Sequence, residues 1–164
     1  MRKLLLAALA AFIAIALASC GDAPSAPDFV KKATKTILYQ VEAGKIASEK
    51  AQSDTVKQFG RDMAETYGKL GEELNGIVQA EKLEVKLPNK LDRRQEKWID
   101  GLGKVTPEKF DKTYAKLEVR SLGRAAELLD RYAEEGGNAA LKQFAANALS
   151  LVKRHLEEAK KLLQ

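Results

Sequence analysis

Residues 53–82 read SDTVKQFGRDMAETYGKLGEELNGIVQAEK, and this stretch decides the fold. Its apolar seam returns at alternating spacings of four and three residues, at Val56, Gly60, Met63, Tyr67, Leu70, Leu74 and Ile77. That spacing marks one face of an α-helix, widened by Phe59, and it is unlike the alternation of a strand. Ser53 offers an N-cap and Asp54 an acid in the first turn. The stretch therefore predicts a long amphipathic helix that ends near Lys82.

The same spacing continues on both sides of this helix. Upstream, residues 28–51 carry a seam at Val30, Ala33, Ile37, Gln40 or Val41, Gly44, Ala47 and Ala51, and its small members would let a neighbouring helix approach closely. Downstream, Thr106-Pro107-Glu108 provides an N-cap hydroxyl, a proline at the first helical position and an early acid, and Gly136-Gly137 ends that helix. Asn138 caps a last helix whose seam is Leu141, Ala145, Ala148, Val152, His155, Ala159 and Leu162.

The connections between these helices predict the architecture. Short links at 52–54 and 136–138 require antiparallel neighbours, whereas Pro88 breaks the pattern between the second and third long helices. Residues 91–105 are expected to form a shorter amphipathic helix, weakened by Gly101 and Gly103, or a long ordered connection. The sequence therefore predicts an all-α fold: a ferritin-like four-helix bundle with a short extra helix in the long crossover.

The first twenty residues predict export and lipidation. Arg2 and Lys3 precede an apolar run, Leu4 to Ala18, of the length of a signal-peptide core. The run closes on Leu17-Ala18-Ser19-Cys20, which resembles the bacterial lipoprotein box, so Cys20 is expected to carry lipid such as palmitate. The expected division is a lipoprotein signal peptide over 1–19, a lipidated cysteine and tether over 20–27, and the bundle over 28–164. An uncleaved anchor, or an ordinary signal peptide with an accidental cysteine, is the alternative.

Composition and charge limit the partners. The 164 residues, 45% hydrophobic and 31% charged, suit one globular domain and are too apolar for a disordered chain. The formal net charge is +5, and loss of Arg2 and Lys3 with the signal would lower it by two. Cations and acids are interleaved along the helices, so we expect no nucleic-acid partner and at most a weak attraction to an anionic lipid or glycan surface. Gly21 after the cysteine favours the outer over the inner membrane.

Few residues could carry chemistry. The chain has one Cys, which excludes an internal disulfide, and one His, which counts against zinc sites. His155 lies on the last seam, where Glu42, Glu65, Glu118 and Glu158 could face it from the helices, yet Val152 stands where a ferritin-type Glu-x-x-His site needs Glu. The weak metal candidates are therefore His155, Glu42 and Glu118, and a packed core histidine is the simpler interpretation. No Gly-x-Ser-x-Gly elbow or phosphate loop occurs, so neither enzymatic activity nor a cofactor is expected.

Several short motifs resemble a known family. They are Asp28-Phe29-Val30, Glu42-Ala43-Gly44-Lys45-Ile46-Ala47, Val56-Lys57-Gln58-Phe59, Phe110-Asp111-Lys112-Thr113-Tyr114 and His155-Leu156. In this order, over residues 28–164, they resemble the ferritin-like domain-of-unknown-function family of bacterial exported proteins of the outer membrane protein type. The resemblance implies a ferritin-like bundle in the cell envelope, with no assigned biochemical activity.

The departures from that family concern its histidines. The family pattern Met-x-x-Asp-His in the second helix is here Met63 followed by Thr66 and Tyr67, and Leu122 stands where a further histidine occurs. Only His155 remains of three histidines, so any metal site of relatives is expected to be lost, with Tyr67 and Leu122 filling the core. A buried Tyr67 needs a partner for its hydroxyl, and we predict a hydrogen bond to His155 or Glu42.

These observations predict a lipid-anchored, periplasm-facing bundle without catalytic activity, which acts as a structural or binding protein of the envelope. A metal-binding or redox protein on a degenerate ferritin-like scaffold is the alternative, with His155, Glu42 and Glu118 as ligands. A third class is an adaptor that binds peptidoglycan or an envelope protein. Trp98 is the nominated contact residue, although a large aromatic residue more often plugs the end of a bundle.

Overall fold

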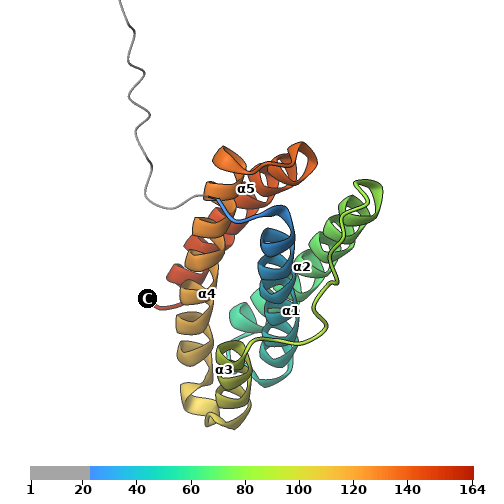
Figure 1. Cartoon of the computed structure of the whole chain (residues 1–164). Coiled ribbons are helices and arrows are strands. Elements are labelled where there is room, and N and C mark those ends of the chain that lie inside the picture. Colours follow the sequence, from blue (N-terminus) through green and yellow to red (C-terminus); the bar gives the residue numbers. More distant parts are fainter. Residues whose placement is uncertain (1–22) are drawn as a thin grey trace, which may run out of the picture.

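The computed structural model describes residues 23–164, which form a bundle of five α-helices and contain no strand (Figure 1). The helices are α1 (Ala26–Lys50), α2 (Asp54–Ala80), α3 (Arg93–Lys104), α4 (Pro107–Glu135) and α5 (Ala139–Lys161). The predicted all-helical bundle, with four long helices and a short one in the crossover, is confirmed. The predicted signal peptide and Cys20 lie outside the described residues. Helix α1 begins two residues before the expected start at Asp28, because Ser25 caps it and Pro27 suits its first turn.

Local capping explains where the helices begin. The Ser53 hydroxyl accepts from the backbone N–H of Val56, and the Asn138 side chain accepts from that of Leu141. A complete capping box starts α3, in which Asp92 accepts from the N–H of Gln95 while the Gln95 side chain accepts from that of Asp92. Thr106 precedes α4 as predicted, but its hydroxyl makes no capping hydrogen bond. Pro107 and the acid Glu108 in the first turn supply the start signal there.

A Schellman motif ends α2 at Ala80. The backbone N–H of Leu83 donates to Val78 O at 3.0 Å, and that of Lys82 donates to Gln79 O at 3.2 Å. Lys82 has a positive φ of 50° at the position where glycine is usual. The chain therefore turns sharply away from the helix axis at this point.

The long helices form two antiparallel hairpins, α1 with α2 and α4 with α5, and these pack side by side (Figure 1). The α1 and α2 backbones cross closely at Gly44 and Gly60: a Cβ on Gly44 would lie 2.5 Å from Gly60 O. The small residues of the first seam therefore allow a close approach, as predicted. Across the hairpins, the Asp111 carboxylate of α4 accepts from the backbone N–H groups of Gln52 and Ser53, both at 2.9 Å.

The crossover from α2 to α3 is an extended strap over residues 81–92 that runs along the outside of the bundle (Figure 1). Its side chains alternate, with Leu83, Val85 and Leu87 half-buried against the core and Glu84 and Lys86 exposed. Helix α3 then lies against α1 and α4. The crossover thus brings α3 to the side of the bundle, where it forms one wall of a cleft described below.

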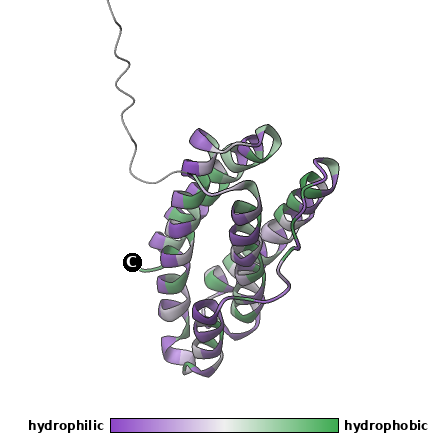
Figure 2. Cartoon of the chain, viewed as in Figure 1, coloured by the Kyte–Doolittle hydropathy of each residue, from purple (hydrophilic) through white to green (hydrophobic). Residues whose placement is uncertain are grey.

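Hydrophobic residues alternate with hydrophilic ones along every helix (Figure 2), as in amphipathic helices that bury one stripe. The core contains many aromatic residues, and Phe29 of α1 stacks on Tyr132 of α4 with ring centroids 3.9 Å apart. None of the helices formed by residues 23–164 combines the length and the apolar character that crossing a bilayer requires.

Candidate functional site

A fully buried carboxylate lies at the centre of the bundle. Glu118 is one helical turn from Tyr114 and from Leu122, so it takes a place on the apolar face of α4. It is 0% exposed, and neither of its carboxylate oxygens has a hydrogen-bond partner among the described residues. Burial raises the pKa of Glu118 to about 8, because the charged form loses its hydration. At neutral pH the folded protein therefore holds Glu118 largely as the neutral acid.

Three tyrosines surround this carboxyl group from three helices. Tyr39 of α1, Tyr67 of α2 and Tyr114 of α4 are buried, and their hydroxyls make no hydrogen bond within residues 23–164. Burial raises the pKa of each phenol, and the charge of Glu118 raises it further. Because that influence requires proximity, we group these tyrosines with Glu118 and Gln40 and call them the Glu118 cluster.

Gln40 connects the Glu118 cluster to the side of the bundle. Its amide lies near Glu118 and lowers the pKa of that carboxyl, opposing the larger effect of burial. Its own hydrogen bond goes elsewhere, since Gln40 Nε2 donates to Ser121 Oγ at 3.1 Å. The predicted seam left Gln40 and Val41 as alternatives, and the structure buries Gln40 completely while Val41 is only half-buried. A polar residue thus occupies a core position.

His155 of α5 and Tyr67 both lie in the core, but they do not hydrogen bond. Their rings pack at a centroid distance of 5.8 Å with a tilt of 45°, and Phe59 packs edge-on to the imidazole. The predicted hydrogen bond from Tyr67 to His155 or Glu42 is wrong, because the Tyr67 hydroxyl lies near Glu118 instead and Glu42 is exposed. Burial lowers the pKa of His155, so the imidazole is neutral at pH 7.

The three weak metal candidates lie in different surroundings. Glu118 and His155 are buried on α4 and α5, whereas Glu42 faces solvent on α1. Within the described part of the chain, no three His, Cys, Asp or Glu side chains come close enough together to hold a metal ion. Beside Glu118 the donors are phenols and an amide. These residues do not fit a ferritin-type dinuclear centre, which needs several carboxylates and histidines.

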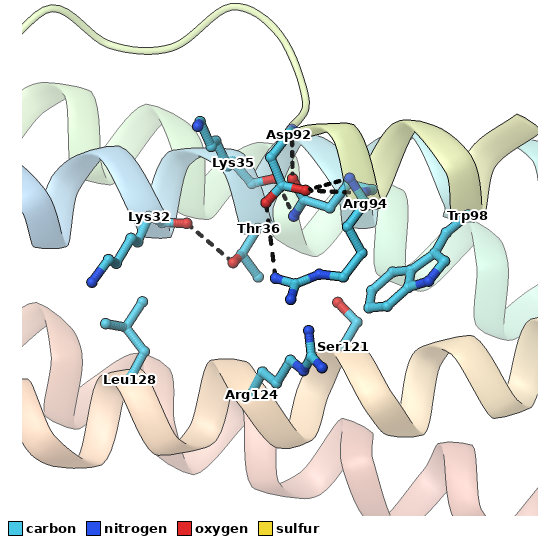
Figure 3. Close-up of a pocket in the computed structure, with 10 residues that line it drawn as sticks. Lys32, Lys35, Thr36, Asp92, Arg94, Trp98, Ser121, Arg124 and Leu128 are labelled. Atoms are coloured by element: carbon cyan, nitrogen blue, oxygen red, sulfur yellow. Dashed lines mark hydrogen bonds and ion pairs between the residues drawn. The ribbon is translucent and has the colours of Figure 1, made fainter.

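A second feature is a cleft on the side of the bundle, with α1, α3 and α4 as its walls (Figure 3). We call it the Trp98 cleft. Its volume is about 390 Å³. Its lining residues are Lys32, Lys35, Thr36, Asp92, Arg94, Gln95, Trp98, Ser121, Arg124 and Leu128. Four of these ten residues are lysine or arginine, and Asp92 is the one acid among them.

Trp98 joins the cleft to the core. One edge of the indole packs on the buried ring of Tyr39, at 5.6 Å and 71°, so the side chain is half-buried. Three guanidinium groups surround the same indole, those of Arg94, Arg120 and Arg124, at 5.6, 6.0 and 5.7 Å from its centroid. Trp98 therefore both supplies burial and presents a surface to the cleft.

Sequence reasoning named Trp98 but missed its arginines. Arg94 was part of a charged run with alternating signs, typical of a solvated face. Arg120 and Arg124 are one turn apart on α4, and this pair of like charges was the available signal. Only the position of α3 against α4 brings all three to one indole.

The fold and these two features define a class: an all-α bundle that encloses one neutral carboxylic acid and carries a cationic cleft on its side. The chain belongs to a family described as a domain of unknown function (DUF4142), whose model matches residues 15–162. This assignment agrees with the part of the sequence resemblance that names a family of unknown function. No protein of curated function and no solved structure matches the chain.

Proposed function

We propose that this protein is a lipid-anchored, periplasm-facing protein of the bacterial envelope, at the outer rather than the inner membrane, and that its bundle is a non-catalytic binding module. The supporting observation is the surface beside Pro24, where a hollow of about 180 Å³ is lined by Lys32, Arg124, Arg131, Pro24, Leu128 and Glu127. Pro24 is four residues from Cys20, which the chain spans in at most about 14 Å. A lipid on Cys20 would hold this cationic surface close to an anionic membrane.

Two observations support binding rather than catalysis. Glu118 is fully enclosed and His155 is nearly so, which leaves neither group accessible to a substrate. The Trp98 cleft, in contrast, opens to the surface and offers fixed cations and an indole. The ferritin-like assignment is part of the proposal, and the length of the crossover strap between the two hairpins supports it.

The anchor is tested by Cys20→Ser in cells that export the protein. We expect the wild-type chain to incorporate labelled palmitate and to sediment with membranes, because a multiply acylated cysteine gives stable attachment. The Cys20→Ser variant should incorporate no label and leave the membrane fraction. Ser19→Ala, which keeps a small residue before the cysteine, is the matched control and should behave as wild type. An unlabelled wild-type chain, or a Cys20→Ser variant that stays with the membranes, would contradict the proposal.

A metal-binding or redox protein is the competing class, and one observation favours it. Both carboxylate oxygens of Glu118 and the amide oxygen of Gln40 lack hydrogen-bond partners among residues 23–164, and oxygen atoms are the ligands of hard cations. Metal analysis of protein purified without chelator, beside Glu118→Gln and His155→Ala, separates the two classes. An adaptor for peptidoglycan or an envelope protein is a form of the binding proposal, which crosslinking in the envelope would identify.

A further inference from the structure

We propose that the Trp98 cleft binds a phosphate-bearing ligand. Four cationic side chains line it, from Lys32, Lys35, Arg94 and Arg124. Its volume of about 390 Å³ is within the range of small-ligand sites. A concave site lined by charges of one sign focuses its field and attracts a ligand of the opposite sign.

The protein neutralises the positive charge of the cleft only in part. The side chains of Lys32, Lys35 and Arg124 make no ion pair within residues 23–164. Arg94 Nη2 lies 3.9 Å from Asp92 Oδ2, while Asp92 Oδ1 accepts two backbone N–H bonds at the start of α3, so this acid offsets one of the four cationic charges. Each guanidinium is attracted to the face of the indole, and an anion bound among these exposed cations would also relieve the repulsion between them. The arrangement therefore points to an anionic ligand.

The polar groups converge on one space. Arg94 from α3 and Arg124 from α4 extend toward each other across the cleft, and the Ser121 hydroxyl points into the same space (Figure 3). Ser121 is 5% exposed and accepts a hydrogen bond from Gln40, so its own proton is free to be donated to a ligand. Trp98 and Leu128 supply apolar surface at the two ends. A tetrahedral oxyanion in this space would meet two guanidiniums and a hydroxyl.

Phosphate matches the arginines and the hydroxyl of the Trp98 cleft better than a single carboxylate does. A free phosphate monoester carries about −1.5 to −2 charges at pH 7, more than a carboxylate, whereas the phosphodiester of a lipid such as phosphatidylglycerol carries one. Guanidinium groups pair with phosphate oxygens through two parallel hydrogen bonds. The ligand would be either the headgroup of an anionic lipid or a free phosphorylated compound. The lipid source rests on the proposed anchor, because the basic surface beside Pro24 shares Lys32, Arg124 and Leu128 with the cleft.

Trp98 is the only tryptophan of the chain, so its fluorescence reports on the cleft alone. Residues 23–164 contain the five helices and the core, and a cooperative urea transition of this fragment is to be shown before the titration. The titrants are inorganic phosphate, glycerol 1-phosphate, and vesicles of phosphatidylglycerol or of phosphatidylcholine. Sodium chloride and sodium acetate at the same ionic strength are the controls for the titrant. We expect saturable changes in Trp98 emission with an anionic phosphate-bearing titrant only, and none with phosphatidylcholine, whose phosphate is balanced by its own choline cation.

The variant Arg94→Gln/Arg124→Gln should weaken this binding by about tenfold or more, since it removes two charge-assisted contacts. The matched control Arg93→Gln/Lys116→Gln removes the same charge from exposed positions of the same two helices and should change affinity by less than about twofold. Circular dichroism checks that both variants fold.

The outcomes separate the sources of phosphate. Binding of glycerol 1-phosphate or inorganic phosphate supports a free ligand, and binding of phosphatidylglycerol vesicles alone supports a lipid headgroup. An emission change that chloride or acetate reproduces overturns the proposal, as does equal weakening in both variants or no saturable change at all. Residues 23–164 lack Cys20, so a negative result in this titration would not contradict the proposed lipid anchor. Conversely, a negative result for lipidation of Cys20 would not contradict a site for a free phosphorylated ligand.

Discussion

A carboxyl group without hydrogen bonds is an expensive residue to bury, and Glu118 is tolerated in the core because it keeps its proton. Ionised, it would require several kcal/mol of desolvation without a compensating cation, so the neutral acid is the form that folds. The phenols of Tyr39, Tyr67 and Tyr114 are suitable neighbours because they add no charge, although none of their hydroxyls makes a hydrogen bond within residues 23–164. Because Glu118 holds its proton more tightly in the folded protein than in the unfolded chain, its protonation is linked to folding.

The stability of the protein should therefore fall as pH rises toward 8. With a pKa of about 8 in the folded protein and the ordinary 4.5 in the unfolded chain, Glu118 binds more protons in the folded state between these values. Linkage then lowers the free energy of unfolding by up to about 1.4 kcal/mol per pH unit. His155 has the opposite effect below its ordinary pKa of 6.5, because burial lowers its pKa. Urea denaturation between pH 6.5 and 8 isolates the contribution of Glu118.

Glu118→Gln should abolish this decline, because the amide has a similar shape and does not titrate. The exposed Glu73→Gln is the matched control on α2 and should keep the wild-type slope. If Glu118→Gln and wild type showed the same slope between pH 6.5 and 8, the buried acid would not be the titrating group.

At the scale of residues, the sequence predicted which side chains are buried better than it predicted which hydrogen bonds they make. Tyr67 and His155 lie on helical seams, and their place in the core followed from periodicity. The partner of the Tyr67 hydroxyl depends on rotamers and on small helix rotations that periodicity does not specify. Glu118 appeared only as a weak metal ligand, because a seam position held by an acid is ordinarily assigned to a metal or to solvent.

At the scale of helices, the sequence predicted which helices form, their order along the chain and the residues at which they begin, because these depend on local chemistry. Ser53 and Asn138 cap their helices as the sequence indicated, through hydrogen bonds to residues three positions on. The Trp98 cleft was not predictable in the same way. It requires α3 to lie between α1 and α4, and this placement comes from the strap and from tertiary packing.

The crossing of α1 and α2 provides an element-scale prediction. Gly60→Ala should lower the free energy of unfolding by about 1–3 kcal/mol, because its Cβ would lie 2.7 Å from Gly44 O and the backbones would have to separate. Gly76→Ala on the same helix is the control. Nothing lies within 4 Å of its added Cβ, so it should raise stability by about 0.5–1 kcal/mol through helix propensity. Urea denaturation measures both, and equal effects of the two changes would contradict the close crossing.

At the scale of the whole molecule, hydrogen bonds at both ends of the bundle join the two helical hairpins. Asp111 of α4 fixes the turn between α1 and α2, and at the other end Asn138 Nδ2 donates to Glu81 Oε2 at 2.9 Å. These bonds set the register of one hairpin against the other, while buried side chains supply the hydrophobic stabilisation. The strap is the remaining link, and it covers the side of the bundle between those ends.

The strap should be part of the cooperative fold rather than a loose connection. Leu83→Ser/Leu87→Ser removes two half-buried apolar side chains, which should lower the free energy of unfolding by about 2 kcal/mol. Glu84→Ser/Lys86→Ser changes the alternate, exposed positions and should leave stability within about 0.5 kcal/mol of wild type. The urea midpoint should move for the first variant only, with an unchanged dependence on urea. Faster trypsin cleavage at Lys86 without a shift in midpoint would instead show that the strap opens independently of the bundle.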